Sequence, residues 1–410
     1  MSKATPKLRG EIDAAPANRN GENYYILHDR SGTSRSRLLL SPLGLLIAGR
    51  LDGTASILEI ADALSRETPW GVGCREVEMV ASALEQALFL DDARFQDFAA
   101  QAERDFLASA VRPAGSAGSA YNADQTALAA DLDRILREAP PPEETPSRMN
   151  RHPRGIVIPH LDYQRGAPGY GQAYRLLASL PKPKTIIIVG TAHMPLRERV
   201  TLCEKDFDTP LGKVGIAHGM ITELRKAVGK RGNLDRDGLA HLNEHSVELQ
   251  AVWLRHIYGE DAAIVPLLAA PLSEFLVGRR APEEAEGDPV LRTVAECLGK
   301  AASSGETMIL ASADLAHVGP RFGEDGEAEG QLLAAVEETD RKYLAAVSQS
   351  AGEGLAALAK TGENLRVCGS AAIFILGLAL AGARTTLLGY HQAITPEMGE
   401  AVTYAAMIFE

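Results

Sequence analysis

Short, uninterrupted runs of Val, Ile and Leu recur through the C-terminal part of the chain, and stretches with helical periodicity separate them. A strand that is apolar on both faces needs cover on both, and chains that alternate such strands with helices form parallel sheets. The pattern therefore predicts an α/β fold, with a mostly parallel sheet and helices on both faces. The runs occupy residues 155–159, 185–190, 263–268, 307–312, 385–390 and 401–409.

Length and charge narrow the classes of protein that this chain can belong to. A chain of 410 residues is long enough for two or three domains. It carries 42 Lys and Arg against 54 Asp and Glu, a net charge of −12. Such a surface repels phosphate backbones and anionic lipid, so we expect neither nucleic acid nor a membrane as the main partner.

The cysteines and the apolar segments favour a cytoplasmic protein. The four cysteines stand far apart with no CxxC pair, and the N-terminus lacks an apolar signal core. We therefore expect reduced thiols in the cytoplasm. The longest uncharged run, residues 367–383, has 17 residues with three glycines and a serine, which favours a buried core helix over a membrane span.

The N-terminal part has the composition of a small domain followed by a linker. Residues 24–29 alternate like a strand, residues 41–67 predict two short amphipathic helices, and residues 77–89 predict a third. This is the inventory of a winged-helix-like α+β domain, which we assign to residues 1–110. Residues 111–153 are rich in Ala, Gly, Ser and Pro and predict a linker with one helix, and the second domain then spans residues 154–410.

Within residues 24–100 the motifs SPLG, a following DG and the IxEIxxxL run resemble the small PqqD-like domains. Those domains hold leader peptides in peptide-modifying systems, so the resemblance implies a peptide ligand for this domain. The alternative is a packing module with no ligand of its own.

Several of the predicted strands end in polar residues. The first run leads into His160, the second into His193, and the fourth into Asp314 and His317. In an open α/β sheet, ligands bind beyond the carboxyl ends of the strands, where such residues can converge. Three imidazoles delivered to one edge of the sheet indicate a functional site.

Two further segments carry groups that suit such a site. Glu244, His245 and Glu248 open a predicted helix, and carboxylates with an imidazole in this position could face the same crevice and exchange protons. The alternative is a charged first turn. Cys368 precedes the apolar helix, where the helix dipole lowers a thiol pKa and favours the thiolate needed for metal binding or nucleophilic attack.

Eight blocks between residues 154 and 410 resemble the Memo family, which is similar in fold to the class III extradiol dioxygenase subunits. In chain order the blocks are PHLDYQRG, GTAHMPL, DTPLGKV, NEHSVELQAVWL, PLL, SADLAH, CGSAAIF and the segment from LGYHQA to AVTYAAMIFE. The resemblance implies a metal site formed by His160, His193 and Cys368. PHLDY, GTAHMP and CGSAAI depart from the commoner PHAGY, GPNH and CGRGPI, but the three ligand types are retained.

Three functions remain open at this point. Two imidazoles and a thiolate suit Fe(II), Cu and Zn and leave positions for oxygen or substrate. The first function is a mononuclear non-haem metal enzyme, with Fe(II) favoured over Cu, that oxidises a small molecule or a peptide side chain. The second is a non-catalytic peptide-binding module. The third is a Zn-dependent hydrolase with Glu244 or His245 as base.

The positions of four residues predict proton-handling roles, and the resemblance implies partners. We expect Glu244, His245, Asp314 and His317 to act as catalytic groups that handle protons around the metal. Family members in bacteria and archaea often occur beside a radical SAM protein and an AMMECR-like protein, in what is called the AmmeMemoRadiSam set, so the resemblance implies such partners.

Overall fold

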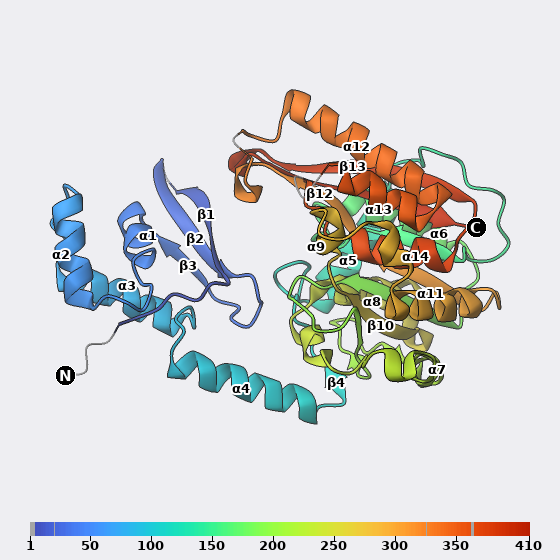
Figure 1. The fold of residues 1–410 in the computed structure, drawn as a ribbon, viewed down its shortest axis with the longest axis horizontal. Coiled ribbons are helices and arrows are strands. Elements are labelled where there is room, and N and C mark those ends of the chain that lie inside the picture. The colour runs from blue at the N-terminus through green and yellow to red at the C-terminus, as the bar shows by residue number, and fades with distance from the viewer. Residues whose placement is uncertain (1–4, 20, 325, 362–364) are drawn as a thin grey trace. The chain divides into compact units, whose positions relative to one another are not determined.

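A computed structural model describes residues 5–19, 21–324, 326–361 and 365–410 (Figure 1). The chain divides into two compact units, Met1–Ala108 and Ser109–Glu410. The boundary assigned from the sequence, residue 110, lies two residues beyond the end of the first unit, and residues 1–4 lie outside the described part.

The N-terminal unit is a small α+β domain with its own core. Three antiparallel strands pair in the order β1-β2-β3, and Leu27, Leu64 and Phe89 are buried between this sheet and the helices. Ser56 and Glu59 form a capping box that starts the second helix. The predicted α+β character is confirmed, and peptide binding stays a prediction. The elements are β1 (Ile12–Arg19), β2 (Glu22–Asp29), β3 (Arg37–Leu40), α1 (Pro42–Ala48), α2 (Ile57–Glu67), α3 (Cys74–Gln86) and α4 (Ala93–Ala108).

The larger unit has a central sheet covered by helices. Its strands are β4 (Val111–Arg112), β5 (Gly155–Ile158), β6 (Thr185–Thr191), β7 (Val200–Leu202), β8 (Asp206–Phe207), β9 (Gly215–Ile216), β10 (Ala263–Ala269), β11 (Thr307–Ser312), β12 (Asp314–Val318), β13 (Thr385–Thr395) and β14 (Glu400–Phe409). Its α-helices are α5 (Gln125–Glu138), α6 (Ala167–Ala178), α7 (His218–Val228), α8 (His245–Tyr258), α9 (Ser273–Leu276), α10 (Glu283–Glu286), α11 (Pro289–Ala302), α12 (Gly330–Gln349), α13 (Ala351–Ala359) and α14 (Ser370–Ala379).

The central sheet is parallel in its middle and antiparallel toward its edges. Its strands run in the order β12-β14-β5-β11-β6-β10-β7, with β13 paired to β14 and β9 to β10. The pairs β5–β11, β11–β6 and β6–β10 are parallel, whereas β14 and β7 join antiparallel. The predicted α/β class is confirmed, and the sheet is mixed because β14 pairs antiparallel with β12, β13 and β5, and β7 pairs antiparallel with β10.

Helices cover both faces of this sheet, as the apolar runs predict. Ile187 and Val189 of β6 belong to a core cluster that includes side chains of α11 and α14. On the opposite face Gly190 lies against α8, and a Cβ atom at this position would meet Ser246 Oγ and Val247 at 2.7 Å. Glycine therefore allows α8 to approach the end of β6 closely.

Residues 109–153 form part of the larger unit, which differs from the linker assigned from composition. β4 pairs in parallel with β8, and Arg112 is fully buried against Glu248 of α8. Asp124 caps α5, which packs on α6. Parts of this segment thus pair and pack within the larger unit, so composition alone placed the start of that unit too late.

The long uncharged run at residues 367–383 contains a short buried helix, as predicted. α14 spans ten residues, and Ile373 and Ile375 are fully buried in the core of the larger unit. Among the described residues, the helices are all too short or too polar to cross a membrane.

Asp340 in α12 is expected to make the stability of the larger unit depend on pH. Burial raises the pKa of this carboxyl from 3.8 to about 6, against the hydroxyls of Thr403 and Tyr390 that lower it. A raised pKa means that the folded state binds the proton more tightly. The contribution of protonated Asp340 to the free energy of unfolding is therefore fully present below about pH 4, and it is lost as the pH rises to about 6.

Asp340→Asn removes this ionisation. The free energy of unfolding of the variant relative to the parent protein should rise by about 1–3 kcal/mol between pH 4 and pH 7. Urea denaturation at several pH values measures it, with the exposed Asp261→Asn as a control. A difference that stays constant over this pH range would contradict the assignment.

Candidate metal centre

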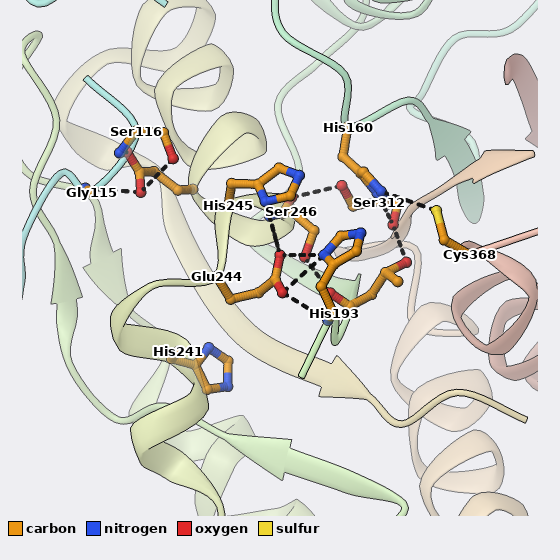
Figure 2. A network of polar contacts seen from close by, with 12 residues as sticks. Gly115, Ser116, His160, His193, His241, Glu244, His245, Ser246, Ser312 and Cys368 are labelled. Carbon is orange, nitrogen blue, oxygen red and sulfur yellow. Dashed lines mark hydrogen bonds and ion pairs between the residues drawn. The ribbon is translucent and has the colours of Figure 1, made fainter. Parts of the chain in front are cut away.

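His160, His193 and Cys368 come together at one end of the central sheet (Figure 2). His160 follows β5, His193 follows β6, and Cys368 precedes α14. One ligand atom from each lies within 4.8 Å of the other two, and His160 Nε2 is 3.4 Å from Cys368 Sγ. The three residues that the family resemblance implies as ligands are thus neighbours in space.

Each histidine of this group is oriented by a hydrogen bond at Nδ1. His160 Nδ1 lies 2.9 Å from the carbonyl oxygen of Ser312, which can only accept, so Nδ1 is the protonated nitrogen. His193 Nδ1 lies 3.0 Å from the carboxylate of Glu244. Both contacts leave Nε2 for a metal ion, and such outer partners fix the tautomer of metal-binding histidines.

The charged residues of this group stabilise the ionised forms of their neighbours. Burial lowers the pKa of His160, but Asp314 and Cys368 outweigh it and raise this pKa to about 9. Burial likewise raises the pKa of Cys368, yet His160 and His317 outweigh it and bring this pKa to about 5. The cysteine is therefore held as a thiolate, the form that binds metals.

Glu244 holds His193 in position and stays ionised. It is the N-cap of α8, and its carboxylate accepts hydrogen bonds from the backbone N–H groups of Ser246 and His193 at 2.9 and 3.0 Å. Burial raises its pKa, but His193 and His245 outweigh this and hold the pKa well below 4.5. These contacts make Glu244 an orienting acceptor.

His245 lies beside the same group as a neutral imidazole. Its ring stacks on that of His193 at 4.7 Å between centroids and lies 5.5 Å from that of His160. Burial lowers its pKa to about 3, although Glu244 acts in the opposite direction. It can therefore donate or accept a hydrogen bond without carrying charge.

Asp314 and His317 also lie close to the thiol of Cys368. Asp314 accepts a hydrogen bond from the backbone N–H of His160 at 2.8 Å, and its second oxygen is 3.5 Å from His160 Nε2. His317 belongs to β12, and its ring packs edge-on against Phe322. Asp314, His317 and Cys368 form a second group with ligand atoms within 4.8 Å of one another.

Glu248, which the sequence analysis places in the same row as Glu244, has a different environment. It is fully buried, pairs with Arg112, and accepts hydrogen bonds from the backbone N–H groups of Gly115 and Ser116 at 3.0 and 2.7 Å. Figure 2 shows Gly115 and Ser116 apart from the histidine cluster. Glu248 therefore fastens the segment after β4 onto α8 and does not face the metal-binding group.

Sequence reasoning missed a buried network that holds the strand ends together. Gln250 donates to the carbonyl of Pro159 and to Ser312 Oγ, both at 2.7 Å. Ser312 Oγ donates to the carbonyl of Ser246, and Ser246 Oγ donates to the carbonyl of Thr191. The polar residues Ser246 and Gln250, one turn apart on a helix face that also carries Val247, Trp253 and Leu254, were the available signal.

The donor set fits a single metal ion. Ligands about 2.0–2.3 Å from a shared ion lie up to about 4.5 Å apart, close to the spacing of His160, His193 and Cys368. Two imidazoles and a thiolate suit Fe(II), Cu and Zn, and hard cations such as Mg²⁺ are disfavoured. These residues can hold an ion and leave coordination positions open.

The chain is similar to a family of proteins over the whole larger unit. A family model described as Memo-like protein matches residues 112–408. MEMO1 family proteins of Methanopyrus kandleri and Thermus thermophilus are 29% and 30% identical to it, over 72% and 71% of this chain and 96% and 79% of their own lengths. One from Aquifex aeolicus is 24% identical over 94% of this chain and 96% of its own length, a coverage that extends into most of the N-terminal unit. The larger unit, with its paired imidazoles and thiolate, thus carries the match, and the chain belongs to the Memo-like family.

Proposed function

We propose that His160, His193 and Cys368 hold one redox-active metal ion, with Fe(II) favoured and Cu second. The chain would use it to oxidise a small molecule or a peptide side chain. The observation that carries this proposal is the convergence of two imidazoles, each fixed at Nδ1, on a thiolate. A bound Fe or Cu ion supplies electron transfer and an open position for oxygen or substrate.

The surrounding residues have separable roles in this proposal. Glu244 orients His193, and Asp314 does the same for His160 through the backbone N–H. His317 lies beside the thiolate and is half-buried, which suits a group that accepts or returns a proton. His245 lies beside both histidines of the proposed metal site, as a neutral group that can form hydrogen bonds.

The geometry gives less support to a Zn-dependent hydrolase. Such an enzyme needs a general base with a pKa near neutral pH. Glu244 is committed to His193 and Ser246 with a pKa well below 4.5, and His245 has a pKa of about 3. Neither residue named as the base has the required proton affinity.

Metal content and oxygen uptake test the proposal. The full chain, purified without oxygen, should contain about one Fe or Cu per chain by elemental analysis. On exposure to air with a reductant, the metal-loaded protein should consume oxygen faster than the metal-free protein. Stoichiometric Zn with no oxygen uptake, even after loading with Fe(II), would overturn the redox proposal.

The cellular setting is also a proposal. The four cysteines are all free, which supports a reducing compartment such as the cytoplasm.

Family membership supports a place in the AmmeMemoRadiSam set beside a radical SAM protein and an AMMECR-like protein. A peptide delivered by the N-terminal unit would fit such a set, and a non-catalytic peptide-binding module is the outcome if no redox activity is found.

A further inference from the structure

A cavity opens directly beside the proposed metal ligands. It has a volume of about 340 Å³, and His193 and Cys368 form part of its wall. This is at the lower end of the range for small-molecule sites, about 300–1,000 Å³. The cavity can hold a small molecule or one large side chain, but not a folded partner.

The fold places this cavity where α/β sheets bind ligands. Its walls come from the residues after β6 and β10, from α9, from the end of α13 and from the segment before α14. β6 and β10 are parallel neighbours, so their carboxyl ends open at the same edge. Ligands in open α/β sheets bind beyond such ends.

The lining combines an apolar body with a single cation. Leu272 and Leu358 are almost fully buried, and Leu276 and Leu365 pack against the same core. Arg366 is the one Lys or Arg among the described lining residues, and these include neither Asp nor Glu. Apart from His193 and Cys368, which belong to the proposed metal site, the described lining residues offer a ligand an apolar wall and one cation, and this favours an apolar ligand with a negative charge.

Arg366 is held in a conformation that few side-chain-bearing residues adopt. Its φ is +42°, in the left-handed region, and its guanidinium lies 3.2 Å from Glu324. Unfavourable backbone conformations persist where the surrounding structure imposes them, and they gather at ligand sites. Arg366 is thereby held at the rim of the cavity, two residues from Cys368.

We propose that this cavity binds the substrate, and that the substrate is a small amphiphilic anion. Its apolar part would lie against the leucines and its anionic end near the positive charge of Arg366, which also pairs with Glu324. The assignment rests on the proposed metal site for its catalytic meaning, but binding itself needs only the cavity.

Octanoate is a suitable probe because it has one carboxylate and a flexible apolar tail. We expect the full-length protein, metal-free or metal-loaded, to bind octanoate with a sub-millimolar Kd by calorimetry. Octylamine has the same tail and the opposite charge, and should bind at least about tenfold more weakly. Equal affinity for the two probes would overturn the role of charge.

Substitutions at the wall locate the binding. Leu276→Trp should fill the cavity and weaken octanoate binding at least about tenfold. Ser273→Trp at the exposed rim provides a second test that places little demand on folding, and Val277→Trp is the matched control because Val277 is 40% exposed and does not line the cavity. Arg366→Gln should weaken octanoate about tenfold and leave octylamine unchanged.

The outcomes separate this inference from the proposed function. Unchanged octanoate affinity in both Ser273→Trp and a folded Leu276→Trp would overturn the cavity as the site, whatever the metal content. Octanoate binding that both variants abolish would support it, even if the purified protein held no Fe or Cu. In that case the redox proposal fails and the binding site stands.

Discussion

Cys368→Ser protein is expected to retain at least about tenfold less metal than the parent protein, with the same unfolding transition as the metal-free parent protein. The hydroxyl of serine stays protonated near neutral pH, whereas His160 keeps the Cys368 thiol ionised with a pKa of about 5. Elemental analysis of anaerobically purified protein, together with a denaturation curve, measures both quantities.

Two controls define what this loss means. Cys203→Ser should leave the metal content unchanged, because Cys203 is buried and its pKa is raised to about 11. Glu244→Gln should keep the metal at saturating concentration but weaken its affinity by about 10–100-fold, as loss of an outer partner of a metal-binding histidine does.

A different result would reassign the third ligand. If Cys368→Ser retains full metal and Asp314→Asn loses it, the ion is bound by a carboxylate with the two histidines. Asp314 is placed for this alternative, since its Oδ2 lies 3.5 Å from His160 Nε2.

Arg112→Met should destabilise the larger unit by about 3–5 kcal/mol, because it leaves the fully buried carboxylate of Glu248 without its cation. The guanidinium also donates to the backbone carbonyls of His241 and Glu244 at 2.9 and 2.7 Å. Arg112→Met/Glu248→Gln should recover part of the loss, since no buried charge then remains unpaired.

The measurement must report the larger unit alone, because a chain with two compact units does not unfold in one step. The chain has two tryptophans. In a Trp70→Phe background, the buried Trp253 gives the fluorescence signal of the larger unit during urea denaturation. A loss below about 1 kcal/mol would show that the pair is not a main support of this fold.

The convergence of His160 and His193 could be predicted because strand direction and residue chemistry are local properties of the sequence. Continuous apolar runs gave the parallel centre of the sheet, and parallel strands bring their carboxyl ends to one edge. His160 and His193 each follow such a strand directly. The family resemblance supplied the remaining ligand, Cys368.

The contacts made by residues 109–121 could not be predicted, because they depend on pairing across more than 100 positions. Arg112 and Glu248 are 136 residues apart, and in the sequence each reads as an ordinary surface charge. Small residues such as Gly115 indicate a flexible linker as readily as a segment packed against a helix. Here a Cβ atom at Gly115 would lie 3.3 Å from the Glu248 carboxylate.

The edges of the sheet were likewise beyond the reach of local patterns. Residues 385–390 and 401–409 are apolar runs like the others. The residue pattern of either run does not show whether its strand lies parallel or antiparallel to its neighbours. Only a short connection of four residues, 396–399, joins β13 to β14, which is too short for a parallel crossover. The ten residues between the two apolar runs, 391–400, are also fewer than such a crossover needs, so the antiparallel pair follows from the spacing of the runs and not from either run alone.

The network of Gln250, Ser312, Ser246 and Thr191 has a consequence for how tightly an ion can bind. All four side chains are buried, at 0–2% exposure, and they join α8 to the ends of β6 and β11 within the protein itself. The histidines are thus fixed before any ion arrives, unlike those of zinc fingers, which fold only with their metal. The affinity for the metal ion is therefore not reduced by the entropy of ordering these side chains. Added metal should raise the melting temperature only because it binds the folded protein, and the rise should depend on the metal concentration.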